Sequence, residues 1–401
     1  MSEALGPLHG VRVLDLTRVL AGPYCTMFLG DLGAEVVKIE QPGVGDDTRS
    51  WGPPFQGGES AYFLCVNRNK RSVTLDLRTP DGIALLRRLA LRADVLMENF
   101  RPGTLAGWGL SETEIRRENP RLIYASLSAF GASGPLKDRP GYDLAMQAWG
   151  GLMSITGPAG GEPSKVGVAI IDVVAGLMLG QSIAAALYAR EKTGEGQRIE
   201  TSLMEAEVAS LINAGSNYLV TGQVPGRWGN AHPNIVPYQS FPTADGHLVV
   251  AMANEAIWAR FCRAAGRPEL AEDPRFDTNA HRVENRDALI ELLNELFRAR
   301  PRRDWIELLN EAGVPCSPVQ DIGEVFESPQ VRATGMLREI DHPTAGKVRM
   351  AGLPVKFSGT PASIRLAPPL LGEHNEQVLR EWLELDEAEV AEVRSRGTLG
   401  S

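Results

Sequence analysis

Hydrophobic and polar positions alternate between two periods over the first 130 residues of the chain. Short apolar runs that are typical of strands are separated by segments whose apolar residues recur with helical spacing, such as residues 82–91. The runs typical of strands are residues 11–16, 35–40, 73–77, 95–97 and 122–127. This order of strands and helices predicts a mostly parallel sheet with helices on both faces.

A long apolar stretch follows at residues 166–189, and its one charged residue is Asp172. We expect a buried helix over residues 173–188, with Asp172 at or just before its first turn. Free backbone N–H groups and the positive end of the helix dipole favour an anion there. Two interpretations of Asp172 remain open: an ordinary N-cap, or a carboxylate nucleophile that the dipole keeps ionised. Asp172 and the polar turn that follows the stretch argue against a membrane span.

The composition changes at residues 221–241, an irregular segment with several turn-forming residues. A strand and several amphipathic helices follow, which indicates a smaller α-rich domain over residues 222–328. We therefore predict a large domain that begins with residues 1–221 and is completed by residues 329–401.

Composition narrows the class of ligand and the compartment. The formal net charge is −9, which argues against non-specific binding to nucleic acid or to anionic membranes. An anionic ligand would therefore need a local basic cluster. The four cysteines form no CxxC pair and the six histidines have no ligand spacing, so we predict no metal site. Residues 1–10 lack the features of a signal peptide, and we expect a cytoplasmic protein.

One basic cluster stands out, in the segment NRNKR at residues 67–71. It precedes the strand predicted at residues 73–77, and Arg78 follows that strand. The cluster is either a solvated charge run or a site for phosphates and carboxylates. A dinucleotide site with Glu40 as the ribose ligand is disfavoured, because no GxGxxG motif connects the first strand to the first helix.

Several motifs in a fixed order resemble the family III CoA-transferases, the CaiB–BaiF group. They are LDLTRVLAGP, LGDLGAEVVKIE, NRNKRSVTLDL, ENFRPG, GYD, KTGEGQRIE and PLLGEH, and they extend over essentially the whole chain. The resemblance implies an α/β fold with a Rossmann-like large domain, which takes both chain ends, and a smaller domain. It also implies a homodimer whose two chains interlock like rings.

The resemblance further implies that Asp172 is the nucleophile and carries CoA as an aspartyl-CoA thioester. Acyl-CoA and free CoA would be substrates, and no permanently bound cofactor or metal would be needed. The positions that match CoA contacts in the family are Val19, Ala21, Leu75, Arg78, Asn99 and Phe100. For Leu75 and Phe100, plain core packing is the alternative. Tyr142 matches an active-site tyrosine, and Gln41 stands where formyl-type enzymes use an arginine for CoA.

Within the family, the sequence favours transfer between succinyl-CoA and a small dicarboxylate such as glutarate or a related C4–C6 acid. Arg68 matches an arginine that recognises the distal carboxylate, and Trp228 and His232 are candidate pocket residues. The glycine-rich loop of formyl-CoA transferases is absent, and a formyl-CoA or oxalate-type CoA-transferase is one alternative; an α-methylacyl-CoA racemase is the other. A racemase would need a histidine where Tyr142 stands, and tyrosine is a poor base near pH 7. A CoA-binding module without turnover is the remaining alternative.

Overall fold

The computed structural model describes residues 5–400, which form two compact units. The first unit combines the chain up to Leu152 with Val166–Thr221 and with the chain from Pro329 onward. The second unit contains Met153–Lys165 and Gly222–Ser328. The divisions after Thr221 and Ser328 coincide with the predicted domain limits, whereas Met153–Lys165 was expected in the large domain. The expectation of no export signal falls partly outside the described residues.

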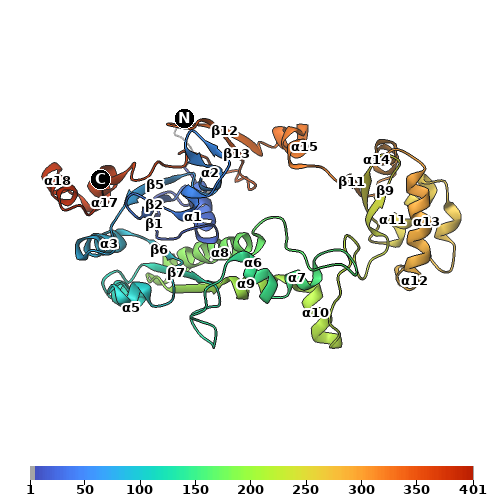
Figure 1. Ribbon diagram of the computed structural model, residues 1–401, viewed down its shortest axis with the longest axis horizontal. Helices are drawn as coiled ribbons and strands as arrows, with labels where there is room; N and C mark the ends of the chain where they lie inside the picture. Colours follow the sequence, from blue (N-terminus) through green and yellow to red (C-terminus); the bar gives the residue numbers. More distant parts are fainter. Residues whose placement is uncertain (1–4, 401) are drawn as a thin grey trace. The chain divides into compact units, whose positions relative to one another are not determined.

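Six parallel strands form the sheet of the first unit (Figure 1), in the order β5-β2-β1-β6-β7-β8. They are β1 (Arg12–Asp15), β2 (Glu35–Glu40), β5 (Lys70–Thr74), β6 (Val95–Glu98), β7 (Ile123–Ser128) and β8 (Arg198–Ser202). Numbered by their sequence within this sheet, the strands lie in the order 3-2-1-4-5-6. This confirms the predicted Rossmann-like α/β fold, in which ligands bind where the strand order reverses, between β1 and β6.

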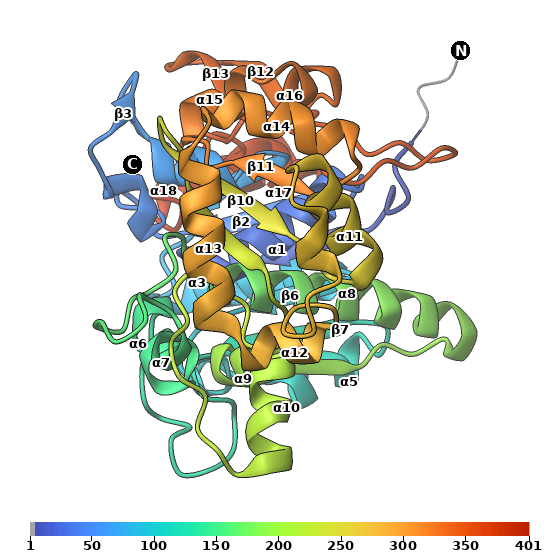
Figure 2. The same cartoon turned by 90° about the vertical axis from the view of Figure 1, so that its right-hand side faces the viewer.

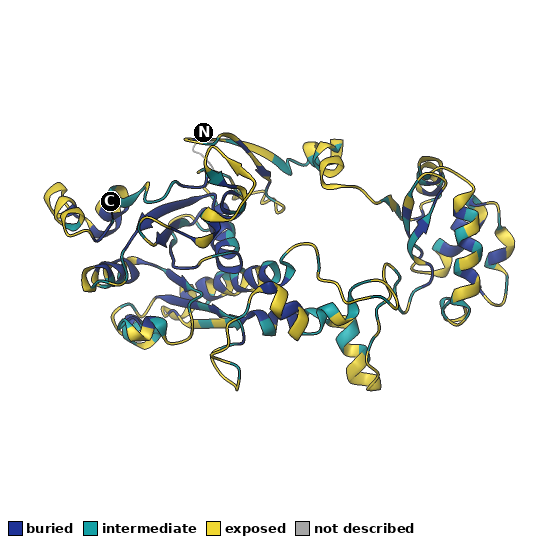
Figure 3. Ribbon diagram, viewed as in Figure 1, coloured by how far each residue is buried: buried dark blue, intermediate teal, exposed yellow. Residues whose placement is uncertain are grey.

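The central strands are apolar on both faces of the sheet. In β1, Val13 belongs to the core on one face and Leu14 to the core on the other, and neither side chain is exposed. The register pairs Val13 with Val36 and Leu14 with Val37 on β2, so the same division continues across the sheet. Parallel strands that are covered on both faces carry nearly continuous apolar residues for this reason. Figure 3 shows these strands as buried.

Helices cover both faces of the sheet. Those whose side chains form the core on the Val13 face are α1 (Ala21–Asp31), α6 (Asp143–Trp149), α8 (Ile170–Thr193) and α9 (Leu203–Ser210). Those on the opposite face are α3 (Pro80–Arg92), α5 (Glu112–Glu118), α17 (Asn375–Leu383) and α18 (Glu387–Ser395). A Cβ atom at Gly176 of α8 would lie 2.6 Å from the carbonyl oxygen of Ala21, so glycine permits the close approach of α8 to α1.

Helix α8 is the predicted apolar helix, and it is long and apolar enough to cross a membrane by length and composition alone. In this structure one of its faces packs in the core of the first unit. The residues of that face include Ile171, Ala175, Leu179, Ile183 and Ala186, which recur every three or four positions. This spacing is that of a helix that packs one face against a sheet.

Two predicted elements differ from the structure. Strand β5 begins at Lys70, three residues earlier than the predicted strand, so part of the basic cluster lies inside the strand. The sequence of residues 203–219 contains no proline and predicts a single helix, whereas the structure divides this stretch into α9 and α10 (Ile212–Thr221). The division falls at Leu211, directly before Ile212, whose φ of +32° is outside the right-handed helical region.

The second unit has its own core around a three-stranded antiparallel sheet in the order β11-β10-β9. Its principal elements are β9 (Tyr238–Pro242), β10 (His247–Ala251), β11 (Cys316–Pro318), α11 (Glu255–Ala264), α13 (Arg286–Arg298) and α14 (Arg302–Glu311). Figure 2 shows the three helices around β10 and β11. Trp258, Phe261, Phe297 and Trp305 fill the core between them. These elements confirm the smaller helix-rich part of the predicted fold.

The remaining elements are short. They are β3 (Phe55–Gln56), β4 (Glu59–Ser60), α2 (Ala61–Val66), α4 (Thr104–Gly107), α7 (Leu152–Ile155), α12 (Asn279–Glu284), α15 (Ile322–Glu327), α16 (Pro329–Ala333), β12 (Leu337–His342) and β13 (Gly346–Ala351), with 3-10 turns at Asp47–Ser50 and Pro268–Ala271.

Candidate active site at the carboxyl ends of the strands

A cavity of about 620 Å³ lies in the first unit where the sheet strands end. Its walls come from the segments that follow β1, β2, β5, β6 and β7, and from the first turn of α8. It therefore occupies the position at which a doubly wound sheet binds its ligand. The cavity brings together the predicted nucleophile, the predicted active-site tyrosine and all the predicted CoA contacts. These are Asp172, Tyr142, Val19, Ala21, Leu75, Arg78, Asn99 and Phe100.

Asp172 lies inside the first turn of α8 and does not cap the helix. The N-cap is Ala169, whose side chain cannot accept a hydrogen bond from the backbone N–H groups of the first turn. Asp143 of α6 takes over this role, because its Oδ1 accepts a hydrogen bond of 2.8 Å from the backbone N–H of Ile171. No donor or cation among residues 5–400 pairs with the Asp172 carboxylate. The N-cap interpretation of Asp172 is therefore wrong, and its carboxylate is available for chemistry.

The surroundings of Asp172 oppose its ionisation. The residue is 8% exposed. Burial, and then the negative charge of Asp143, raise the pKa of Asp172 to about 7. Burial and Asp143 thus act in the direction opposite to that expected of the helix dipole. A carboxyl group in a cavity with a pKa near neutrality is typical of a functional site, because both of its protonation states are accessible there.

The sequence interpretation missed two aromatic residues near Asp172. Burial, and then the Asp172 carboxylate, raise the pKa of Tyr62 to about 12. Trp51 packs edge-on against Tyr62, with 5.2 Å between the ring centroids. Trp51 follows the carboxyl end of β2 in a Gly/Pro-rich loop, and Tyr62 lies in α2 shortly after it. Their position beyond the carboxyl end of β2 could have indicated the site, but the hydrophobic periodicity alone did not.

The cavity also contains the positive charge that an acidic protein needs for an anionic ligand. Arg101, Lys137 and Arg139 line it, and within the described part of the chain none of them forms an ion pair. Arg139 lies over the ring of Phe130, 5.6 Å from its centroid. Cations without carboxylate partners are suited to bind phosphates or carboxylates of a ligand. The predicted basic cluster at residues 67–71 is thus not where these charges lie.

The structure places Arg68 outside the cavity and gives it a structural role, which corrects its predicted contact with a substrate carboxylate. The residue is 3% exposed. Its Nε and Nη2 donate to the two carboxylate oxygens of Asp31 at 3.0 and 2.7 Å, and its Nη1 donates to the carbonyl oxygen of Ala351 at 2.7 Å. The physical reason is the position of the strand. Because β5 begins at Lys70, Arg68 precedes the amino end of β5, whereas the cavity lies beyond the carboxyl ends.

Two further candidates, Trp228 and His232, belong to the second unit and are not among the residues that line this cavity. Trp228 is exposed, and the guanidinium of Arg286 lies 4.7 Å from its ring centroid. Nδ1 of His232 accepts a hydrogen bond of 3.0 Å from the backbone N–H of Asn234. Their predicted contact with substrate stays a prediction.

The described residues contain no cluster of three or more histidine, cysteine, aspartate or glutamate side chains that could hold a metal ion.

Arg78 lines the cavity, but both of its contacting nitrogens donate to the neighbouring Asp76, at 2.8 and 2.9 Å. The chemistry that the site itself offers is therefore that of a buried carboxylate beside unpaired cations.

The fold and the cavity define a doubly wound α/β protein that presents one buried, unpaired carboxylate at its ligand site. The family model "CoA-transferase family III" matches residues 8–375. The chain belongs to this family and is a CoA-transferase, which confirms the resemblance in its motifs.

Three comparisons illustrate the relationship. The chain is 44% identical over 393 residues to succinyl-CoA:glutarate CoA-transferase of Homo sapiens, covering 98% of this chain and 90% of that protein. It is 42% identical over 381 residues to succinate–glutarate CoA-transferase of Agrobacterium fabrum (strain C58), covering 94% and 95%. A CAIB/BAIF family protein from Brucella suis superimposes with a TM-score of 0.83 at 42% identity, covering 94% of this chain and 100% of that one.

Proposed function

We propose that the protein moves CoA from succinyl-CoA to glutarate or a related dicarboxylate, and that Asp172 carries the CoA as a thioester. The observation that carries this proposal is the buried carboxylate of Asp172, which faces the cavity without a partner and has a pKa raised to about 7. The names of the human and Agrobacterium relatives support succinyl-CoA and glutarate as the substrate pair.

The first half-reaction begins when a carboxylate oxygen of Asp172 attacks the thioester carbonyl carbon of succinyl-CoA. The C–S bond breaks, and CoA leaves as a thiolate from a mixed anhydride of Asp172 and succinate. The thiolate then attacks the carbonyl carbon of Asp172, the anhydride C–O bond breaks, and succinate leaves as a carboxylate. The product is an aspartyl-CoA thioester.

The second half-reaction is the reverse of the first with a different acid. A carboxylate oxygen of glutarate attacks the aspartyl thioester and releases the thiolate. The thiolate attacks the glutaryl carbonyl carbon, which restores the Asp172 carboxylate and forms glutaryl-CoA. Charge is conserved in every step and no proton is transferred. Each half-reaction starts and ends with one CoA thioester and one free carboxylate, so neither ATP nor a metal ion enters the scheme.

The cations of the cavity fit this substrate class. CoA carries several phosphate charges and succinate carries a second carboxylate, and the net charge of the protein would otherwise repel both. Arg101, Lys137 and Arg139 supply the opposing charge inside the cavity.

A racemase has no support from the cavity. A base that removes the α proton near pH 7 is ordinarily a histidine, and none of the described residues that line the cavity is a histidine. We therefore expect no enzyme-dependent exchange when a 2-methylacyl-CoA is incubated in deuterated water. Exchange that increases with enzyme concentration would contradict this expectation.

Mass spectrometry after mixing with succinyl-CoA tests the proposed intermediate. An acid-quenched sample should contain a peptide with Asp172 linked to CoA, and Asp172→Ala should abolish both this adduct and transfer to glutarate. Asp304→Ala is a matched control, because Asp304 also lies in the first turn of a helix, α14, but is exposed. An adduct on a different residue, or a normal transfer rate in folded Asp172→Ala, would reject Asp172 as the carrier.

We further propose that the working unit is a homodimer. Large apolar side chains stay exposed on α8, α9 and α10 of the isolated chain, among them Leu177, Tyr188, Val208, Leu219 and Val220. Neighbouring exposed apolar groups mark protein interfaces. Light scattering at micromolar concentration should report about twice the chain mass of 43.4 kDa. A stable monomer with full activity would refute the dimer.

A further inference from the structure

Val19 adopts a conformation that its side chain disfavours. It lies between β1 and α1 on the wall of the cavity, and its φ is +73°. A β-branched residue rarely has a positive φ, because its Cβ substituents crowd the backbone. Such a conformation persists only where the surroundings hold it in place, and it is found most often at functional sites. Two groups of contacts hold the backbone around Val19.

The first is the side-chain amide of Asn99, which follows β6. Its Oδ1 accepts a hydrogen bond of 2.9 Å from the backbone N–H of Arg18, and its Nδ2 donates one of 2.8 Å to the carbonyl oxygen of Arg18. Both polar atoms of the amide are thus engaged by one backbone residue. The contact joins the loops after β1 and β6, which flank the point where the strand order reverses.

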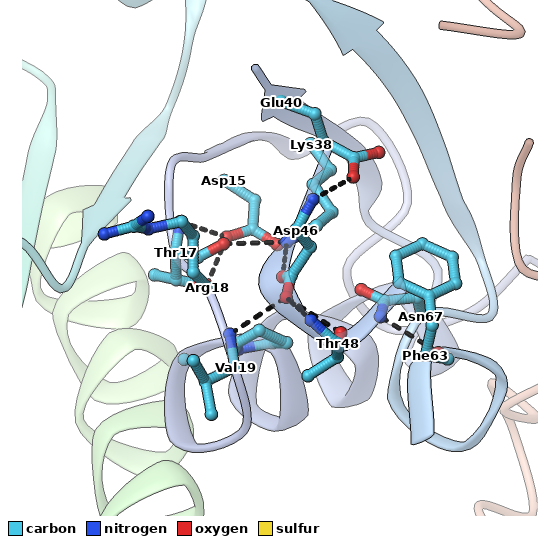
Figure 4. A network of polar contacts seen from close by, with 12 residues as sticks. Asp15, Thr17, Arg18, Val19, Lys38, Glu40, Asp46, Thr48, Phe63 and Asn67 are labelled. Carbon is cyan, nitrogen blue, oxygen red and sulfur yellow. Dashed lines mark hydrogen bonds and ion pairs between the residues drawn. The ribbon is translucent and has the colours of Figure 1, made fainter. Parts of the chain in front are cut away.

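The second is the buried ion pair between Lys38 and Asp46, which lies beside Thr17 and Val19 (Figure 4). Lys38 Nζ lies 2.8 Å from Asp46 Oδ2, and neither side chain is exposed. Lys38 Nζ also donates to the carbonyl oxygen of Thr17 at 2.7 Å, and Asp46 Oδ1 accepts from the backbone N–H of Val19 at 3.3 Å. The ion pair therefore holds the backbone at Thr17, two residues before Val19, and at Val19 itself.

The loop is connected to the nucleophile through α1. Leu20 is the N-cap of α1, and the carbonyl oxygen of Ala21 lies against Gly176 of α8, one turn after Asp172. The conformation at Val19 thus sets the cavity wall next to the first turns of α8.

We propose that Asn99 and the Lys38–Asp46 pair are positioning residues that hold Val19 in its left-handed conformation and so shape the acyl-CoA site beside Asp172. The proposal rests on the proposed function, in which this cavity takes acyl-CoA. It also changes the role of Asn99 that the family resemblance implied. Asn99 acts through the backbone of Arg18, to which its amide oxygen and its amide nitrogen each make a hydrogen bond.

A rescue experiment tests the proposal, because glycine adopts a positive φ without strain. Asn99→Ala removes two hydrogen bonds, and we expect the KM for succinyl-CoA to rise about tenfold or more. In a Val19→Gly background, adding Asn99→Ala should raise the KM for succinyl-CoA far less than it does in the wild type. The midpoint of the pH profile of adduct formation should not move, since Asp172 keeps its surroundings.

Asn119→Ala is the matched control. Asn119 also joins two segments of the first unit, through a 2.9 Å hydrogen bond from its Nδ2 to the carbonyl oxygen of Ala93, but it is outside the cavity. We expect a lower thermal stability and an unchanged KM for this variant. Asp46→Asn should raise the KM as Asn99→Ala does, and Val19→Gly should again relieve the defect. Circular dichroism establishes that each variant is folded.

The outcomes separate this proposal from the proposed function. If the Asp172–CoA adduct forms in the wild type but Val19→Gly fails to relieve the Asn99→Ala defect, the positioning role is refuted and Asn99 contacts the ligand directly. An unchanged KM in Asn99→Ala would refute it as well. If no adduct forms at Asp172 in the wild type, the proposed function fails first.

Discussion

Asp172→Asn should make the protein more stable while it abolishes transfer. The pKa of Asp172 rises from 3.8 to about 7 on folding, because of burial and then of Asp143. The folded pKa lies above the unfolded one, so the unfolded chain loses its proton first as the pH rises. Stability therefore falls between about pH 4 and pH 7 and stays constant above that range. Asparagine has no proton to lose, and the variant escapes this loss.

The magnitude follows from the two pKa values. Each pKa unit corresponds to about 1.4 kcal/mol, so the difference of about three costs the folded wild type about 4 kcal/mol above pH 7. At pH 5 the pH is only about one unit above the pKa of the unfolded carboxyl, and the cost is about 1–2 kcal/mol. Between pH 5 and pH 8 the advantage of the variant should therefore grow by about 2–3 kcal/mol.

The assay is thermal unfolding of both proteins at a series of pH values from 5 to 8, without CoA, because a ligand would add its own stabilisation. At roughly 2 °C per kcal/mol for a large domain, the difference in Tm should widen by about 4–6 °C. Asp304→Asn provides the control, since Asp304 has the same first-turn position in α14 but is exposed. Its Tm should follow that of the wild type. If the curves of Asp172→Asn and the wild type are parallel, the argument from burial is refuted.

Three further predictions follow from the same contacts. The rate of adduct formation from succinyl-CoA should rise with pH and level off above about 7, because only ionised Asp172 attacks. Asp143→Asn should move the midpoint of this pH profile to lower pH by removing a negative neighbour of Asp172. An unmoved midpoint would contradict the role of Asp143. Arg68→Ala should leave Asp31 buried and without its cation, and should destabilise the protein by about 3 kcal/mol or more in urea unfolding. It should reduce transfer to glutarate and to butyrate by the same factor. A loss of transfer to glutarate alone would instead support contact between Arg68 and the substrate. Lys137→Ala should raise the KM for succinyl-CoA about tenfold with an unchanged Tm, whereas the exposed Lys192→Ala should change neither.

The sequence was sufficient for the architecture, because the architecture rests on local patterns. Successive apolar side chains of β1 point to opposite faces of the sheet, and the apolar residues of 286–298 recur at helical spacing on one side of the helix. Each element is therefore recognisable from its own residues. The position of the cavity follows from parallel strands in this order. Ala21, Leu75 and Phe100, which the family resemblance assigned to the CoA site, lie on its wall.

The sequence by itself thus determined the family, the fold and the location of Asp172 near the start of an apolar helix, although only one face of that helix is buried in the chain. Only the tertiary structure decided what each charged side chain faces. Arg68 is paired with Asp31, Ile171 is capped by Asp143, and Arg18 is held by Asn99, across 37, 28 and 81 positions of the chain. The pKa of Asp172 depends on the same placement, since burial and a neighbouring charge set it. Residue type and periodicity describe a side chain's chemistry, but its partners and its solvent exposure exist only after the chain has folded.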